Sequence, residues 1–117
     1  AKLMESCWTK EMDQQILEVV EQHFLQNLCV DDFEPLQRKL LVFKPQIYQR
    51  YEVLRQKSDK VDRFWFQQSE QILLTWWKTN RNTQQKNWSE LWIALKDYDV
   101  FDVARYVKRN RLDEDRE

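Results

Sequence analysis

Apolar side chains recur along this chain at intervals of three and four residues, the spacing that places them on one face of an α-helix. The clearest example is segment 10–28, where Ile16, Val20, Phe24 and Leu28 follow one another every four residues. Alternating β-branched runs and Asn-Gly or Asp-Gly hairpin turns, the signals of β-strands, do not occur. The pattern therefore predicts an all-α protein.

Six helices are expected from this spacing and from the residues that typically flank helices. Their expected ranges are 10–28, 33–41, 45–54, 59–79, 84–96 and 100–110. Residues whose side chains typically cap a helix N-terminus precede them: Thr9, Asp31 or Asp32, Ser58 or Asp59, Asn82 (with Gln85 as its capping-box partner) and Asp99. Pro35 and Pro45 fall in first turns, where the missing N–H costs nothing.

The apolar faces of these helices predict the core and the architecture. The residues expected in the core are Phe33, Leu36, Leu40, Ile47, Leu73, Leu91, Leu95 and Val103. In segment 59–79, Val61, Trp65, Ile72 and Trp76 lie near one stripe, and Leu73 and Trp77 near the adjoining one. The short connections predict a compact antiparallel six-helix bundle. We expect residues 1–117 to form a single domain, with a core at about 10–110 and a charged tail at 111–117.

Length and composition narrow the class of protein further. A chain of 117 residues that is 42% hydrophobic and 33% charged is expected to fold as one domain. It contains no apolar run long enough to span a membrane, and its first residues, AKLMESCW, lack a signal-peptide core. Cys7 and Cys29 are too few for a disulfide scaffold, so we expect idle or buried thiols in a reducing, cytoplasmic compartment.

Catalytic, metal and cofactor sites are not expected. His23 is the only histidine, and no serine or cysteine is spaced to serve with it as a nucleophile. The chain has no glycine, which excludes the glycine-rich loops that cradle phosphates. Asp97, Asp99 and Asp102 surround a helix start, where capping explains them better than metal binding.

Aromatic and basic residues interleave in RFWFQQ and WWKTNR, as in proteins that stack nucleic-acid bases. At helical spacing the favoured interpretation is that these rings fill a core. Residues 31–110 hold fifteen basic and eleven acidic side chains, an excess too mild for a nucleic-acid surface. No nucleic acid is therefore expected as a partner, and no membrane.

The absence of glycine also requires other residues to close the helix ends, because glycine is the usual residue in left-handed geometry. Asn80, Asn82 and Asn110 are the side chains best suited to replace it. We expect at least one of Asn80 and Asn82 to have a positive φ between the fourth and fifth helices.

The stretch LLTWWKTNRNTQQKNWSELWIALKDYDVFDVARYV, residues 73–107, resembles the death domain family of signalling modules. The residues that carry the resemblance are the leucine pair Leu73 and Leu74 with Trp77, the L-x-x-A-L pattern of Leu91, Ala94 and Leu95, the DVA of Asp102, Val103 and Ala104, and upstream Phe33, Leu36, Leu40 and Ile47. The chain departs from the family pattern at Leu41, where glycine is common, at Gln37, where a small residue is usual, and at Arg50, where an aliphatic residue is usual.

The resemblance implies a Greek-key bundle with Trp77 in the core, and it leaves Trp76 either at the core edge or partly exposed. It also implies a non-catalytic module that joins other death domains in apoptotic or inflammatory signalling. Its contacts would be charged side chains of the second and third helices, which match Asp31, Asp32, Glu34, Arg38, Lys39 and Arg50. Two alternatives stay open: these charges only solvate a face, or the chain is a designed protein with this fold and no partner. The absence of glycine is a hint of design.

Overall fold

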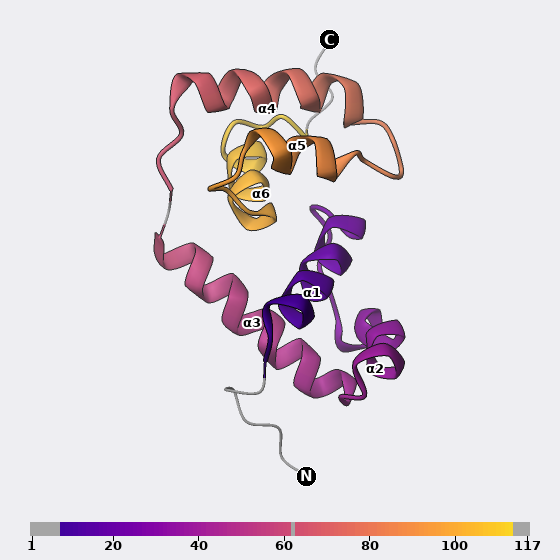
Figure 1. The fold of residues 1–117 in the computed structure, drawn as a ribbon. Helices are drawn as coiled ribbons and strands as arrows, with labels where there is room; N and C mark the ends of the chain where they lie inside the picture. The colour runs from indigo at the N-terminus through magenta and orange to yellow at the C-terminus, as the bar shows by residue number, and fades with distance from the viewer. Residues whose placement is uncertain (1–7, 62, 114–117) are drawn as a thin grey trace. The chain divides into compact units, whose positions relative to one another are not determined.

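The computed structural model describes residues 8–61 and 63–113, and within them it contains helices and no strands (Figure 1). The elements are α1 (Lys10–Gln22), the short 3-10 helix η2 (Val30–Phe33), α2 (Glu34–Leu40), α3 (Lys44–Val61), α4 (Gln67–Asn80), α5 (Trp88–Ala94) and α6 (Val100–Arg109). The prediction of an all-α protein with six α-helices is confirmed. Cys7 and most of the predicted tail lie outside the described residues.

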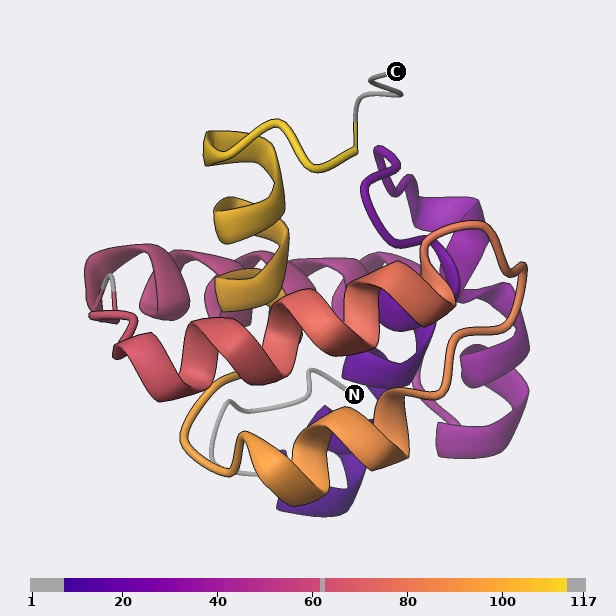
Figure 2. The same cartoon turned by 90° about the horizontal axis from the view of Figure 1, so that it is seen from above.

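The chain divides into two units, residues 1–57 and residues 58–117, and the boundary falls inside α3. In the first unit α1 packs against η2 and α2. In the second unit α4 and α5 lie alongside each other, and α6 runs across the direction of α4 (Figures 1 and 2). The single domain and the Greek-key arrangement stay predictions.

The first helix begins as predicted and ends earlier. The Thr9 hydroxyl oxygen accepts a hydrogen bond from the backbone N–H of Met12 at 3.1 Å, which confirms Thr9 as the N-cap. The predicted extension to residue 28 is wrong, because α1 ends at Gln22 and Leu25 adopts left-handed geometry with a φ of 66°. Leu28 is nevertheless buried, and it lies in irregular backbone between α1 and η2.

The predicted N-cap of the second helix is wrong, because the N-cap residue of α2 is Phe33, which makes no side-chain capping bond, and Asp31 and Asp32 lie inside the preceding 3-10 helix η2. Asp32 accepts a hydrogen bond from the backbone N–H of Cys29 at 2.8 Å, and Pro35 lies in the first turn of α2 as predicted. At the other end, Leu41 closes α2 in left-handed geometry, with a φ of 56° and a ψ of 39°. Leucine thus occupies the conformation that glycine adopts most readily, at the position where the death-domain pattern has glycine.

The third helix continues through the segment KSDK, where we expected a break. Ser58 and Asp59 are therefore not N-caps but lie inside α3, and Ser58 is buried. Their side chains bond residues of the α6 region, since the Ser58 hydroxyl donates to Asp99 at 3.2 Å and Asp59 accepts from Arg105 at 2.7 Å. The break falls after Val61 instead, and α4 begins at Gln67.

This later break changes the aromatic segment before α4. Val61 and Trp65 do not belong to the stripe of α4 as predicted, and Val61 is exposed. Phe64 and Phe66 are exposed as well, while Trp65 between them is half-buried. The prediction that the rings of RFWFQQ fill a core is therefore wrong for both phenylalanines.

The connection between α4 and α5 closes without a left-handed asparagine. Positive φ angles occur, among the described residues, at Leu25, Leu41 and Arg111, so the prediction for Asn80 and Asn82 is wrong. The predicted capping box of Asn82 and Gln85 is also wrong. Asn87 caps α5 instead, because its side-chain oxygen accepts from the backbone N–H of Glu90 at 3.3 Å.

Buried Asn80 ties this connection together through its side chain. Its amide nitrogen donates to the backbone oxygen of Trp76 at 2.9 Å, and its amide oxygen accepts from the backbone N–H of Asn87 at 2.9 Å. The amide nitrogen and the amide oxygen of Asn80 thus each have a hydrogen-bond partner inside the protein, as buried polar groups require. Side-chain hydrogen bonds replace the turn that a glycine would otherwise supply.

The predicted core is buried with one exception. The buried residues are Phe33, Leu36, Ile47, Leu73, Trp77, Leu91, Leu95 and Val103, whereas Leu40 is half-buried. Trp76 is buried too, whereas the core edge and partial exposure were the two expected alternatives. Each indole N–H of the pair finds a backbone acceptor, since Trp76 donates to Asn87 at 2.7 Å and Trp77 donates to Leu112 at 3.1 Å. Such partners allow two adjacent tryptophans to be buried together.

Candidate interaction surface

The charged side chains of α2 are ordered along the helix. Asp31 and Glu34 lie at its start, and exposed Arg38 and Lys39 lie in its last turn. This order complements the helix dipole, which favours acids near the N-terminus and bases near the C-terminus. Lys44 at the start of α3 bonds the acidic end, with its amine 2.8 Å from Asp31 and 3.9 Å from Glu34. The hydrogen bond to Asp31 raises the pKa of Lys44.

The basic end of α2 has no such partner. Arg38 and Lys39 form no ion pair with any residue that the structure describes. Directly after them come Leu41 and Phe43, two large apolar side chains that are exposed, Leu41 to 89%. We call Arg38, Lys39, Leu41 and Phe43 the α2 surface. The sequence pattern predicted the charged residues of this surface but not its exposed apolar residues. The departure from the family pattern at Leu41, where glycine is common, was the signal that could have indicated them.

Asp32 and Arg50, two of the six predicted contact residues, also have structural roles, and their part in an interaction stays a prediction. Asp32 lies inside η2 and accepts from the backbone N–H of the N-cap residue Cys29, which lowers the pKa of the Asp32 carboxyl group. Arg50 is only 10% exposed and forms a two-pronged ion pair with Asp13 of α1, with both N···O distances at 2.9 Å. Its charge therefore joins α3 to α1.

A second charged cluster lies inside the unit formed by residues 58–117. Asp99 and Asp102 cap α6 reciprocally, each carboxylate accepting from the other residue's backbone N–H at 2.8–2.9 Å. This confirms Asp99 as a cap and gives Asp102 the capping role expected for it. Arg105 donates to Asp102 and to both Ser58 and Asp59, which joins the last turns of α3 to α6.

Asp102 is 2% exposed, and this burial raises the pKa of its carboxyl group to about 6. The backbone N–H of Asp99 and the guanidinium group of Arg105 oppose that rise. The polar groups of this cluster bond one another, so we assign the cluster a structural role in joining α3 to α6. Among the described residues no group of three or more histidine, cysteine, aspartate or glutamate side chains is placed to hold a metal ion.

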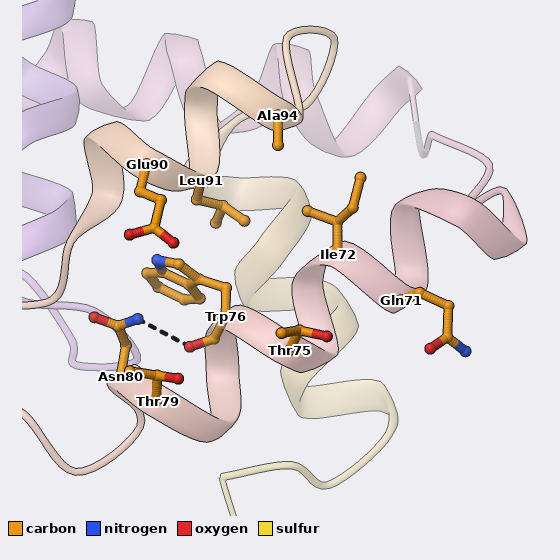
Figure 3. A pocket seen from close by; sticks show the side chains of 9 residues that line it. All are labelled: Gln71, Ile72, Thr75, Trp76, Thr79, Asn80, Glu90, Leu91 and Ala94. Carbon is orange, nitrogen blue, oxygen red and sulfur yellow. Dashed lines mark hydrogen bonds between the residues drawn. The ribbon is translucent and has the colours of Figure 1, made fainter.

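A cavity of about 370 Å³ lies between α4 and α5 (Figure 3). Its apolar walls are Ile72 and Trp76 from α4 and Leu91 and Ala94 from α5, while Glu90 lies beside the Trp76 indole. These helices carry the motifs of the death-domain resemblance. The cavity has the size to accept one or two apolar side chains.

Comparison of the chain with family models, with curated proteins and with solved structures gives no match. None of the helices within residues 8–61 and 63–113 combines the length and apolar character needed to cross a membrane.

Proposed function

We propose that this chain is a non-catalytic protein interaction module of the death-domain type, which assembles with other death domains through its α2 surface. One observation carries the proposal: Arg38 and Lys39 are exposed at the end of α2 with no ion pair among the described residues. Charges that form no ion pair within the described residues remain available to attract a partner.

The physical role of such charges is to select the partner and accelerate encounter, more than to add affinity. Exposed Leu41 and Phe43 beside them would supply the apolar contact that charge pairs at an interface rim lack. The partner would present carboxylates toward Arg38 and Lys39. Exposed Cys29, a free thiol, suits a reducing compartment, and the proposed location is the cytoplasm.

The alternative, a designed protein with this fold and no partner, is favoured by the absence of glycine. The backbone argues against it. Leu25, Leu41 and Arg111 all have positive φ angles, and designed backbones avoid that conformation for residues other than glycine. Exposed leucine and phenylalanine side chains are likewise avoided on designed surfaces.

The test reverses the basic charges of the α2 surface. In the variant Arg38→Glu/Lys39→Glu, we expect association with a panel of natural death domains to be lost. The matched control is Lys78→Glu/Lys108→Glu, which reverses two exposed lysines in the last turns of α4 and α6. Both variants change the net charge equally and place acids at helix C-termini, so both should lose about 0.5–2 kcal/mol of stability.

Size-exclusion chromatography with light scattering, at low and high salt, measures the association. The proposal requires that complexes of the wild-type chain weaken as salt rises and that only the α2 variant abolishes them. Equal association of the two variants would show that α2 is not the interface. A wild-type chain that stays monomeric with every member of the panel would favour the designed alternative.

A further inference from the structure

The cavity between α4 and α5 has the volume and the walls of a small-molecule site. Its volume of about 370 Å³ lies within the roughly 300–1,000 Å³ that is typical of ligand pockets. Its surface is mostly apolar and includes Ile72, Leu91 and Ala94. Among the described residues that line the cavity, Glu90 is the one that carries a charge. A mostly apolar cavity with a few fixed polar groups is the usual form of a site that binds and orients a small ligand.

The charge lies at one end of the cavity and apolar side chains lie at the other (Figure 3). Glu90 and Asn80 are placed where α4 ends and α5 begins, whereas Ile72 and Ala94 lie farther along the two helices. A ligand in the cavity would therefore place a polar group beside Glu90 and an apolar body between Ile72 and Ala94.

Hydrogen bonds hold the charged end in place. The side-chain amide of Asn87 donates to the Glu90 carboxylate at 3.0 Å. The backbone of Asn87 is itself fixed from two sides, since its N–H donates to Asn80 at 2.9 Å and its oxygen accepts from the Trp76 indole at 2.7 Å. The carboxylate is thus positioned before any ligand arrives, which reduces the entropy cost of binding.

No cation of the described residues neutralises the Glu90 carboxylate through an ion pair. The Asn87 amide that bonds it is neutral. Lys86, the basic residue closest in the sequence, donates its amine to the backbone oxygen of Thr83 at 2.9 Å instead. Lys78 of α4 is exposed and is not part of the cavity lining. The charge of Glu90 therefore favours a ligand that brings a cation, because a hydrogen bond between two charged groups is stronger than one between neutral groups.

We propose that this cavity binds a small organic amine in its ammonium form, at a site separate from the α2 surface. The ammonium group would donate hydrogen bonds to the Glu90 carboxylate. The alkyl or aryl body of the amine would pack against Ile72, Leu91 and Ala94, where burial of apolar surface supplies the remaining affinity.

The same lining disfavours the other occupants of an apolar cavity. An anion would be repelled by Glu90. A neutral apolar molecule would remove water from the carboxylate and give it no cation in return. A lysine side chain of a partner protein offers the same ammonium group, but its single unbranched chain would fill the cavity less completely than a ring, and close packing favours the fuller occupant.

The test titrates the nitrogen-15-labelled full chain at pH 7 with three ligands of similar size and different charge: 2-phenylethylammonium, 2-phenylethanol and phenylacetate. Chemical shifts of the Trp76 indole N–H and the Glu90 amide report occupancy. We expect 2-phenylethylammonium to bind with a dissociation constant of about 1 mM, as suits a ligand of this size. The alcohol and the carboxylate should bind about tenfold more weakly or not at all. Nα-acetyl-lysine methylamide, which supplies a lysine side chain, should also bind more weakly.

Two variants locate the binding. Glu90→Gln removes the charge and keeps an oxygen that can accept from Asn87, so it should weaken binding of the ammonium about tenfold and leave binding of the alcohol unchanged. Ala94→Phe fills the cavity and should abolish binding of 2-phenylethylammonium. The matched control is Asp97→Asn, which removes an exposed carboxylate that is not part of the lining and should leave the affinity unchanged.

Urea midpoints establish that each variant is folded. Absence of shifts with 2-phenylethylammonium, or equal affinity for the alcohol, would overturn the proposal. So would binding of the ammonium that survives Ala94→Phe or is unchanged by Glu90→Gln. Tighter binding of the lysine compound would assign the cavity to a partner protein and would equally overturn the small-molecule assignment.

Discussion

Leu41 provides a direct test of how α2 ends in a chain without glycine. With a φ of 56° and a ψ of 39°, this residue occupies the left-handed region. A side chain with a Cβ costs about 1–2 kcal/mol there, whereas glycine carries no such penalty. Glycine in turn loses about 0.5–1 kcal/mol more backbone entropy on folding. Since Leu41 is 89% exposed, its replacement removes almost no packing. Leu41→Gly should therefore stabilise the protein by about 0.5–1 kcal/mol.

The matched control is Leu41→Ala, which removes the same exposed side chain and keeps the Cβ. We expect its free energy of unfolding to stay within about 0.5 kcal/mol of wild type. Urea denaturation followed by tryptophan fluorescence measures both variants, and equal m-values are required for the comparison. A glycine variant no more stable than the alanine variant would refute the left-handed end of α2.

Three further predictions concern the second unit. Trp77→Ala should cost about 3–5 kcal/mol in urea denaturation, because it deletes a large buried ring, and a loss below about 1 kcal/mol would contradict that burial. Asn80→Ala should cost about 1–3 kcal/mol and speed hydrogen exchange at the Asn87 amide, which loses its acceptor; unchanged exchange would contradict the bond. Asp102 has a folded pKa of about 6, above the unfolded value of about 3.9, so its protonation stabilises the native state. That stability is fully present below about pH 4 and is lost as the pH rises through 6. Relative to Asp102→Asn, wild type should lose up to about 3 kcal/mol between pH 4 and pH 7 in urea denaturation, and parallel pH profiles would contradict the raised pKa.

Short-range patterns were sufficient for the helical class and for several boundaries. Thr9 and Asp99 cap the helices that follow them, and Pro35 lies in a first turn, because caps act on backbone groups two or three positions away. Buried faces also followed from the spacing of apolar residues, since helical periodicity is a local property. The charges of α2 were visible for the same reason: Arg38 and Lys39 are adjacent to the helix end that they complement.

Contacts between residues distant in the chain account for what local patterns did not predict. KSDK reads as a break, yet α3 passes through it because Ser58 and Asp59 bond Asp99 and Arg105, more than forty positions later. The local pattern predicts Arg50 as a surface charge, yet Arg50 forms an ion pair with Asp13 of another helix.

The same reasoning applies to the aromatic segment before α4. Local spacing assigned its rings to a core, whereas the tyrosines of the α6 region hold only Trp65 and leave Phe64 and Phe66 exposed. Helix periodicity and capping depend on neighbours within about four residues. Which helix end continues, and which ring is buried, depends on partners that only folding brings together.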